Sequence, residues 1–324
     1  MRRRTILAGL AALAAPAPGW AQRLPRVGFV GFASMATDNS TIDPFRAAMR
    51  ELGQIEGRTY VLETRSSEGD VERGHAMIDA LARLPVDVFL SPGPAATRAI
   101  LRKTKTPIVA VALPATESEP ELFRSLAHPG GQVTGFSAYG EELSAKRIEM
   151  LKEVLPGLKV VGVLHTTTDP TYRDWGEQTM DQARKQGLEP VRLGLTSPSP
   201  AAAADHVSRL RAIGGGALLV IRDFLTWSLM GEICTLGAVS RIAVIGESNE
   251  IARVGALFSY GADIGDLFRR AAAYVDRILR GTRPGDLPIQ LPTKFELVVN
   301  LRTAHTLGLA FPEALLARAD QQID

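Results

Sequence analysis

The stretch VDVFLSPGPAATRAILRK, residues 86–103, contains a complete strand-to-helix unit. Residues 86–90 are apolar at nearly every position, which is typical of a strand that is covered on both faces of a parallel sheet. Gly93 and Pro94 then end the extended stretch, and the fixed φ of Pro94 favours the first turn of a helix over residues 95–103. A short apolar strand followed directly by a helix is the repeating unit of α/β proteins.

The same alternation of short apolar runs and helical patterns continues on both sides of this stretch. Strands are expected at residues 26–32, 60–64, 108–113, 133–136, 160–165, 190–195, 217–222, 242–246, 256–260 and 295–300. Helices are expected at residues 44–52, with Asp43 as N-cap, and at 70–83, 119–126, 141–154, 264–280 and 312–319. Repeated strand–helix–strand units imply parallel sheets with right-handed crossovers.

The expected strands are more numerous than those of a typical open sheet. We therefore predict an α/β protein with two Rossmann-like lobes. The first lobe is expected to comprise residues 23–138 plus about 255–284, and the second residues 139–254 plus about 285–324. A multi-strand hinge would join the two parallel sheets. The prolines at positions 284, 288 and 292 indicate an extended crossing between the lobes.

The first 22 residues have the composition of a secretory signal peptide. Three arginines at positions 2–4 precede an apolar run over residues 6–15, and small residues at Gly19 and Ala21 offer a cleavage site. The apolar run is shorter than the roughly 20 residues that span a bilayer. Residues 3–7, RRTIL, also fit the twin-arginine export pattern loosely. We expect a protein that is soluble after processing and works outside the cytoplasmic membrane; the alternative is a frayed cytosolic N-terminus.

Composition excludes several classes of protein and site. Removing the three signal arginines takes the formal charge from +2 to −1, which argues against a nucleic-acid partner. Cys234 is the only cysteine, so no intramolecular disulfide can form. Phosphate-loop, zinc-protease and nucleophile-elbow motifs are absent, and the five histidines show no metal-ligand spacing. We therefore expect no metal, no cofactor and no enzymatic activity.

Ligands of open parallel sheets bind beyond the carboxyl ends of the strands, and this rule selects the candidate site residues. In the first lobe they are Ala33, Ser34, Gly93, Pro94, Ala95, Ala96, Leu113, Pro114 and Ser137. In the second lobe they are His165, Thr166, Asp223, Phe224, Glu247 and Tyr260.

The loop at residues 93–96 is the most specific of these candidates. Gly93 permits close approach and Pro94 begins a helix, so the free N–H groups of the first turn face outward at the positive end of the helix dipole. A carboxylate could bind there without a basic side chain. The alternative is an ordinary strand-to-helix turn.

Asp223 and Glu247 follow second-lobe strands, where each could pair with a ligand ammonium group. Each could equally be the N-cap of the helix that follows. His165 could donate a hydrogen bond into the cleft or cap its own strand. Tyr260 could line the cleft or the hinge.

Two tryptophans of the second lobe stand at expected helix starts. For Trp175 and Trp227 the sequence favours core packing over stacking on a ligand.

Short motifs along nearly all of the chain carry a resemblance to a known family. They are Phe45-Arg46, Glu51-Leu52-Gly53 with Glu56-Gly57, Pro129-Gly130-Gly131 with Thr134-Gly135, Ser144-Ala145-Lys146-Arg147 before Leu151, and, as the closest part, Ser259-Tyr260-Gly261, the helix over residues 269–281, Leu287-Pro288, Pro292-Thr293-Lys294-Phe295-Glu296-Leu297, Asn300-Leu301, Leu307-Gly308-Leu309 and Arg318-Ala319-Asp320. The chain resembles the substrate-binding proteins of ABC transporters of the tryptophan and aromatic-amino-acid type, which have the type I periplasmic binding protein fold.

The resemblance implies a periplasmic solute-binding protein of an ABC importer. Its two lobes would close over a small carboxylate-bearing ligand, an amino acid or similar, and its partner would be a permease in the inner membrane. The residues at 113–115, 165–167 and 224 depart from the Asp-Pro, Asn-Pro and Asn that members often carry. Another small carboxylate or an amide-bearing nutrient therefore stays open as the ligand. The alternative functions are a secreted, twin-arginine-exported enzyme and the ligand-sensing domain of a signalling system.

Overall fold

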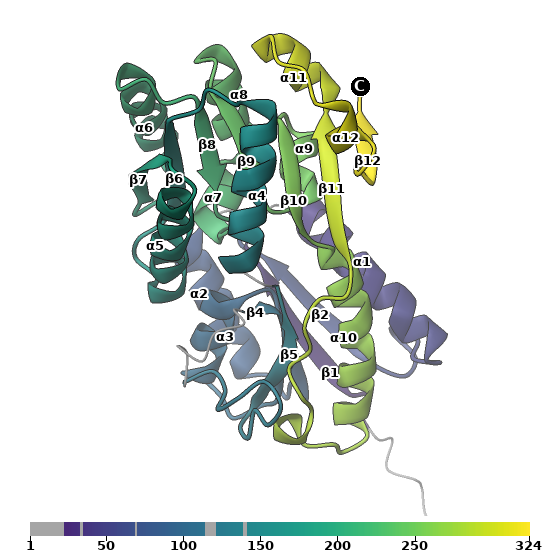
Figure 1. Ribbon diagram of the computed structural model, residues 1–324. Coiled ribbons are helices and arrows are strands. Elements are labelled where there is room, and N and C mark those ends of the chain that lie inside the picture. The colour runs from purple at the N-terminus through teal and green to yellow at the C-terminus, as the bar shows by residue number, and fades with distance from the viewer. Residues whose placement is uncertain (1–22, 33–34, 69, 114–120, 139–140) are drawn as a thin grey trace, which may run out of the picture.

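Two sheets form the framework of the protein in the computed structural model (Figure 1), which describes residues 23–324 except 33–34, 69, 114–120 and 139–140. The first sheet has the order β2-β1-β3-β4-β5 and is parallel throughout. The second has the order β12-β11-β10-β9-β8-β6-β7, and only the β10–β11 pair is antiparallel. We call each sheet with its covering helices a lobe, and the predicted α/β class is confirmed.

The strands of the first lobe are β1 (Arg26–Gly31), β2 (Val61–Ser66), β3 (Val88–Ser91), β4 (Ile108–Leu113) and β5 (Val133–Ser137). Those of the second are β6 (Val160–Thr166), β7 (Glu189–Leu195), β8 (Ala217–Val220), β9 (Ala243–Gly246), β10 (Phe258–Ala262), β11 (Phe295–Asn300) and β12 (Gln321–Ile323). The central strands are buried along their whole length because helices cover both faces.

The described helices divide between the faces of the two sheets. In the first lobe, α1 (Met35–Glu51) and α10 (Ile264–Leu279) cover one face, and α2 (Val71–Ala82) and α3 (Pro94–Leu101) cover the other. In the second, α4 (Glu141–Val154), α5 (Pro170–Lys185), α11 (Leu301–Leu307) and α12 (Glu313–Leu316) lie opposite α6 (Pro200–Ala212), α8 (Met230–Val239) and α9 (Asn249–Arg253). Two short elements complete the set: α7 (Phe224–Ser228) and the 3-10 turn η1 (Pro284–Asp286).

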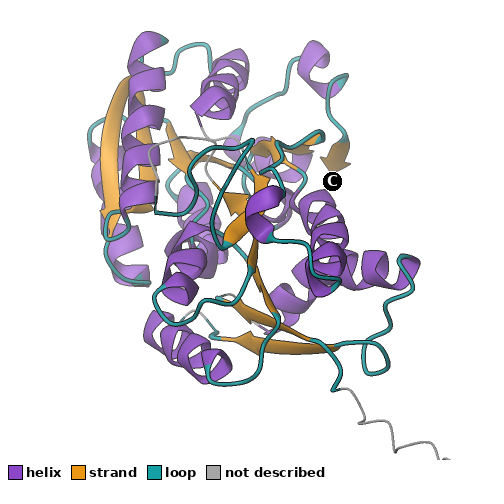
Figure 2. Ribbon diagram, turned by 90° about the horizontal axis from the view of Figure 1, so that it is seen from below, coloured by secondary structure: helices purple, strands orange, loops and turns teal. Residues whose placement is uncertain are grey.

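The chain passes between the lobes three times, after β5, after β10 and before β11 (Figures 1 and 2). The expected placement of residues 255–262 in the first lobe differs from the structure, because β10 pairs with β9 and β11 in the second sheet. Residues 285–290 were expected in the second lobe, yet Leu287 and Ile289 are buried in the cores of the first. Hydrogen bonding explains this, since Gln290 N–H donates to Gly135 O on the edge strand β5.

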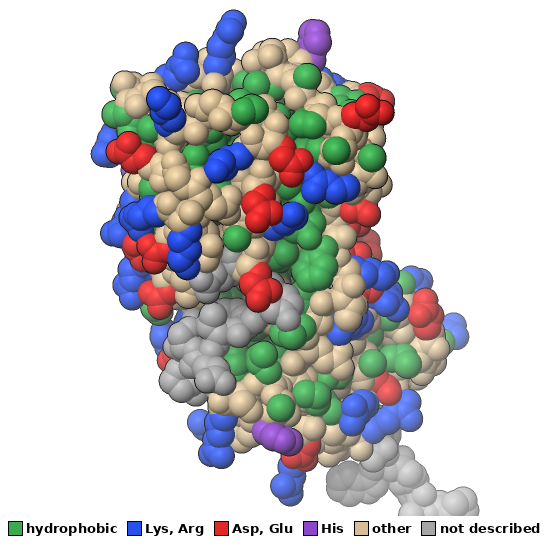
Figure 3. Space-filling model, viewed as in Figure 1, with side chains coloured by type: hydrophobic (Ala, Val, Ile, Leu, Met, Phe, Trp, Pro, Cys, Tyr) green, Lys and Arg blue, Asp and Glu red, His purple; other side chains and the backbone are tan. Residues whose placement is uncertain are grey.

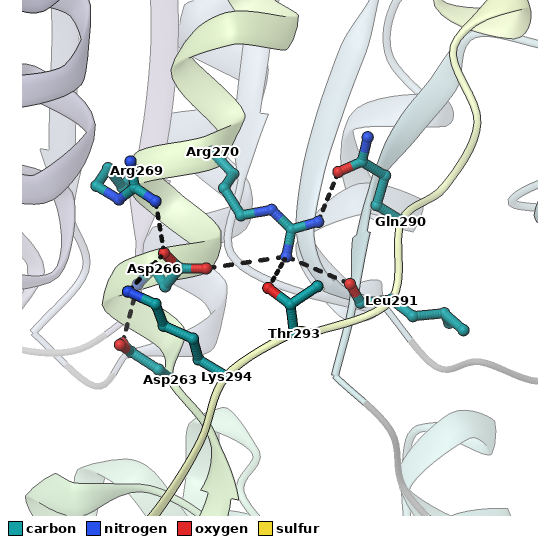
Figure 4. A network of polar contacts seen from close by, with 8 residues as sticks. All are labelled: Asp263, Asp266, Arg269, Arg270, Gln290, Leu291, Thr293 and Lys294. Atoms are coloured by element: carbon teal, nitrogen blue, oxygen red, sulfur yellow. Dashed lines mark hydrogen bonds and ion pairs between the residues drawn. The ribbon is translucent and has the colours of Figure 1, made fainter.

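Arg270, on α10, connects two of the crossings (Figure 4). Its guanidinium donates to the side chain of Gln290, at 2.5 Å, and to the carbonyl of Leu291, at 3.3 Å. It also lies 5.0 Å from the ring centre of Phe136, next to the point where the chain leaves β5. On the same helix, Asp266 pairs with Arg269 at 2.8 Å. A polar network therefore holds the crossing segments against the start of α10.

Two helix predictions were wrong. The first helix begins at Met35 rather than at Pro44, because Ile42 fills the first core and Asp38 accepts a hydrogen bond from Ser66 Oγ at 2.7 Å. These contacts extend the helix through a proline that sequence reasoning placed at its start. In the described part of the expected helix at 119–126, residues 121–126 are irregular, and the adjacent Leu122 and Phe123 are both buried.

The surface agrees with the near-neutral composition. On the face shown in Figure 3, Lys and Arg side chains are interspersed with Asp and Glu over both lobes. No helix among the described residues is long and apolar enough to cross a membrane. Within the same residues, no group of three or more His, Cys, Asp or Glu side chains is arranged to hold a metal ion.

Candidate functional site

Two adjoining cavities lie between the lobes, at the carboxyl ends of the strands. The first is lined by Phe29, Phe32, Asp38, Thr41, Pro92, Gly93, Ala95, Ala96, Tyr172, Arg222, Asp223, Phe224 and Trp227. The second is lined by Pro92, Gly93, Ala112, Ala138, Leu143, Arg147, Tyr172, Trp175, Arg222, Glu247, Ala262 and Ile264. Four residues border both cavities: Pro92 and Gly93 from the first lobe, and Tyr172 and Arg222 from the second. The walls of the site therefore come from both lobes.

The first-lobe wall is the turn from β3 into α3. Gly93 has φ +129°, a conformation that side chains other than glycine's disfavour, and it is the N-cap of α3 without a capping side chain. Thr97 Oγ1 donates to Gly93 O at 2.7 Å and lies 2.9 Å from Ser91 Oγ, which fixes the turn. The N–H groups of Ala95 and Ala96, in the first helical turn, have no acceptor within the helix.

Asp223 combines a structural role with a place on the cavity wall. Its Oδ1 accepts hydrogen bonds from Leu225 N–H, Thr226 N–H and Thr166 Oγ1 at 2.8–3.1 Å, and its Oδ2 accepts one from Thr166 N–H at 2.8 Å. Burial nevertheless raises the pKa of Asp223 to about 6. The N-cap interpretation of this residue is confirmed.

Glu247 faces an arginine inside the second cavity. Arg147 Nη1 donates to Glu247 Oε1 at 3.1 Å, and Arg222 N–H donates to Oε2 at 3.1 Å. Burial raises the pKa of Glu247 and the adjacent guanidinium opposes that rise. Arg147 Nε is held in turn by Tyr260 O at 2.6 Å. Glu247 is thus an ion-pair partner of Arg147 rather than an N-cap.

Arg222 and Trp227 form a cation–π pair on the second-lobe wall. The guanidinium carbon lies 4.2 Å from the centre of the Trp227 ring, a favourable cation–π distance. Both side chains border the first cavity, and Arg222 also borders the second. The pair brings a positive charge to the centre of the cleft.

Two direct contacts bridge the lobes beside the cavities. Arg98 on α3, only 5% exposed, places Nη2 at 2.5 Å from both carboxylate oxygens of Asp169, which is the N-cap of α5. Phe32 after β1 lies 5.7 Å from Phe224, ring centre to ring centre. The ion pair links α3, whose N-cap is Gly93, to α5, which carries Tyr172 and Trp175.

The sequence model of the ABC transporter substrate binding protein family matches residues 27–323. The chain belongs to this family. It is 24% identical to the tyrosine-binding protein of Clostridioides difficile (strain R20291) over 269 residues, covering 82% of this chain and 75% of that one.

Solved structures agree with the type I periplasmic binding protein fold. A conserved domain protein from Vibrio cholerae O1 biovar El Tor N16961 has a TM-score of 0.85 at 23% identity, with 93% of this chain and 100% of that chain covered. An ABC domain from Streptococcus pneumonia in complex with L-Trp has a TM-score of 0.84 at 23% identity and the same coverage. The predicted family and fold are confirmed.

The substrate-binding protein brings some of the predicted residues together in its cleft. Those on a cavity wall are Gly93, Ala95, Ala96, Asp223, Phe224 and Glu247. Those that the structure places elsewhere are Pro94, Leu113, Ser137, His165, Thr166 and Tyr260. Ala33, Ser34 and Pro114 lie outside the described residues.

Several of the predicted residues that lie away from the cavity walls are buried in the sheets instead. Leu113 is in the first-lobe core, and Ser137 Oγ donates to its carbonyl at 3.0 Å. His165 packs against α5 with Nδ1 3.3 Å from Val163 O, and burial lowers the pKa of its imidazole. Neither of the two roles predicted for this histidine describes that position.

Two of the remaining three residues act on the site without lining it. Thr166 holds Asp223 through its N–H and its hydroxyl. The ring of Tyr260 stacks against Phe295 at 6.4 Å, while its carbonyl accepts the hydrogen bond from Arg147. Pro94 is buried in the first turn of α3.

Among the cleft side chains that sequence reasoning missed, five are aromatic or charged residues of the second lobe: Arg147, Tyr172, Trp175, Arg222 and Trp227. Four of them lie within helices, so the rule of strand ends does not select them. Arg222 directly precedes Asp223, and its position after β8 was the one available signal. For Trp175 and Trp227 sequence reasoning favoured core packing. Trp175 does pack against the second-lobe core, and the structure also places both tryptophans on cavity walls.

Proposed function

We propose that this protein is the solute receptor of an ABC importer, that it works in the periplasm, and that it delivers a small carboxylate-bearing ligand to a permease in the inner membrane. The observation that carries the proposal is a cleft whose walls come from two lobes joined by three chain crossings. A ligand that contacts both walls favours the closed arrangement by its differential affinity for that state. The signal-peptide pattern of residues 1–22 supports export.

The cleft has the chemistry of a small-molecule site. Aromatic side chains from both lobes, Phe32, Tyr172, Phe224 and Trp227, surround the first cavity, and a few charged groups stand among them. Mostly apolar walls with a small number of oriented polar groups are typical of such sites. The relatives named for tyrosine binding and for a complex with L-Trp make an aromatic amino acid the first ligand to test.

The proposal is tested by identifying the ligand and then measuring its uptake. Native mass spectrometry of the gently purified protein should show a co-purified small molecule. A strain that lacks the gene should lose uptake of that solute, or of labelled L-tyrosine or L-tryptophan. Complementation with the full gene should restore uptake, whereas a gene without codons 2–22 should not, because its product stays in the cytoplasm.

Other outcomes would favour the alternative functions. Unchanged uptake in the deletion strain, together with loss of a transcriptional response to the same solute, would favour a sensor. A purified protein that converts the solute instead of releasing it intact would favour an exported enzyme. Either result would contradict the importer role.

A further inference from the structure

The charged groups of the cleft differ in whether the protein already supplies their partners. Asp223 accepts four hydrogen bonds, and Glu247 accepts one from Arg147 and one from Arg222 N–H. Asp38 accepts one from Ser66 Oγ. The carboxylates that border the cavities are therefore supplied with donors by the protein itself.

The guanidinium of Arg222, by contrast, is not supplied with a carboxylate partner by the described part of the protein. No carboxylate among the described residues lies within ion-pair distance of its guanidinium, and its Nε is buried without a hydrogen-bond partner there. Its buried neighbour Arg147, by contrast, is neutralised by Glu247 at 3.1 Å. A buried donor that lacks an acceptor is costly, and the cost is larger for a charged group.

The side chain of Arg222 is also held in place. The Arg222 guanidinium carbon lies over the Trp227 ring, 4.2 Å from its centre, and the backbone N–H of Arg222 donates to Glu247 at 3.1 Å. Stacking leaves the in-plane N–H groups of a guanidinium available to an acceptor, because the ring covers only its face. The planar fork fits a carboxylate by two parallel hydrogen bonds.

We propose that Arg222 binds the anionic group of the ligand and shares it with the first turn of α3 on the opposite lobe, an inference that rests on the proposed receptor function. Both features border the first cavity, where Ala95 and Ala96 present free N–H groups at the positive end of the α3 dipole. A carboxylate between them contacts both lobes at once. The ligand's charge thereby favours closure, and its ring lies among Phe32, Tyr172 and Phe224.

The assignment is tested by calorimetry with probes that separate carboxylate from ammonium. L-tyrosine and L-tryptophan carry both groups, tyramine and tryptamine lack the carboxylate, and 3-(4-hydroxyphenyl)propionate lacks the ammonium. We expect the wild-type protein to bind the carboxylates more tightly than the amines. Arg222→Gln should weaken carboxylate binding by roughly 10- to 100-fold, the scale of a charge-assisted hydrogen bond, and leave amine binding unchanged.

Matched variants separate this role from a structural one. Arg222→Lys keeps the charge without the planar fork and should recover part of the affinity. Arg211→Gln removes an exposed arginine of the same lobe and should bind as the wild type does. Ala95→Asp places a negative charge in the α3 turn and should abolish carboxylate binding, whereas the uncharged Ala95→Asn should retain most of it. Thermal melts establish that each variant is folded.

Three results would overturn the assignment. The first is an Arg222→Gln protein that is folded and keeps the wild-type ratio of carboxylate to amine affinity. The second is carboxylate binding by Ala95→Asp that equals that of Ala95→Asn, which would remove α3 from the anion site. The third is an uncharged co-purified solute, which would overturn the role of Arg222 and leave the receptor function standing. A protein that binds neither these probes nor any co-purified solute would contradict both proposals.

Discussion

At the scale of single residues, Asp223 shows how one carboxylate serves the fold and the cleft together. It holds the first turn of α7 and the end of β6 through four hydrogen bonds, yet it borders the first cavity. Its donors offset only part of the cost of burying the charge, since its pKa is raised to about 6. The native state therefore takes up a proton at a higher pH than the unfolded chain does.

This shift predicts a pH-dependent difference between the wild type and Asp223→Asn. Between about pH 6 and pH 4 the native state holds more protons than the unfolded state, so lowering the pH through this window stabilises the wild type at this site. The variant cannot take up that proton, and its amide faces Thr166 N–H with one acceptor fewer. We expect Asp223→Asn to be less stable, by about 1–3 kcal/mol, with a larger deficit at pH 5 than at pH 7.5.

Urea unfolding at the two pH values measures this difference. Asp205→Asn, which removes an exposed carboxylate on α6, is the control and should show a small deficit that does not change with pH. A deficit of equal size at both pH values for Asp223→Asn would mean that Asp223 does not titrate in this window.

The residues of the site were predictable from sequence only where position along a strand determines them. Gly93, Asp223 and Glu247 lie within three residues after the ends of β3, β8 and β9, and all three border the cleft. His165 and Leu113 also end strands but point into the cores, because successive side chains of a strand alternate between faces. A shift of one residue along a strand decides whether a side chain faces the cavity or the core. In fully buried strands both faces are apolar, so the sequence does not show which residues face the cavity.

At the scale of elements, α3 and α5 form the contact between the lobes next to the cleft. Arg98 and Asp169 join them, and the carboxylate of Asp169 also accepts the N–H of Thr171 at 2.9 Å as the N-cap of α5. The helix starts that carry the cavity walls are thus tied to the ion pair that bridges the lobes. Opening of the lobes has to break this pair.

Asp169→Asn separates the bridge from the cap, because asparagine is an equally good N-cap but carries no charge. We expect α5 to stay folded, the ligand-free protein to show a larger radius of gyration by X-ray scattering, and the affinity for its ligand to fall about tenfold. Asp181→Asn changes an exposed ion pair on the same helix and should alter neither quantity. Unchanged scattering and affinity in a folded Asp169→Asn protein would show that the bridge does not contribute to closure.

The elements themselves were largely predictable where local pattern and tertiary contact agree. The strands β4 and β11 and the helix α4 have the expected bounds, because apolar runs or clear end signals define them. The start of α1 did not follow from the local pattern, since Ile42 and Asp38 are held by partners far along the chain. Long-range contacts of this kind leave no mark within a short window of sequence.

At the scale of the whole molecule, the proposed receptor role requires that the protein is exported. The RRTIL pattern at residues 3–7 fits the twin-arginine export pattern loosely, and the general secretory route is the alternative. If the twin-arginine route is used, replacing Arg3 and Arg4 together by lysine should cause the precursor to accumulate in the cytoplasm, as cell fractionation and immunoblotting would show.

Arg2→Lys is the matched control, because it lies outside the arginine pair and keeps the positive charge of the segment. It should leave export unchanged. Normal export of the doubly substituted chain would point instead to the general secretory route.

The triple crossing of the chain also affects how the protein can be made. Phe268 and Val275 on α10 fill the core of the first lobe, where Phe268 meets Phe29 edge to face at 6.2 Å. The ribosome releases this helix only after ten of the twelve strands that the structure describes, including those at the centre of the second lobe. On one face of the nascent first sheet, the part that α10 covers therefore stays exposed through most of translation, and the lobe cannot complete its core while the C-terminal part of the chain is still unmade.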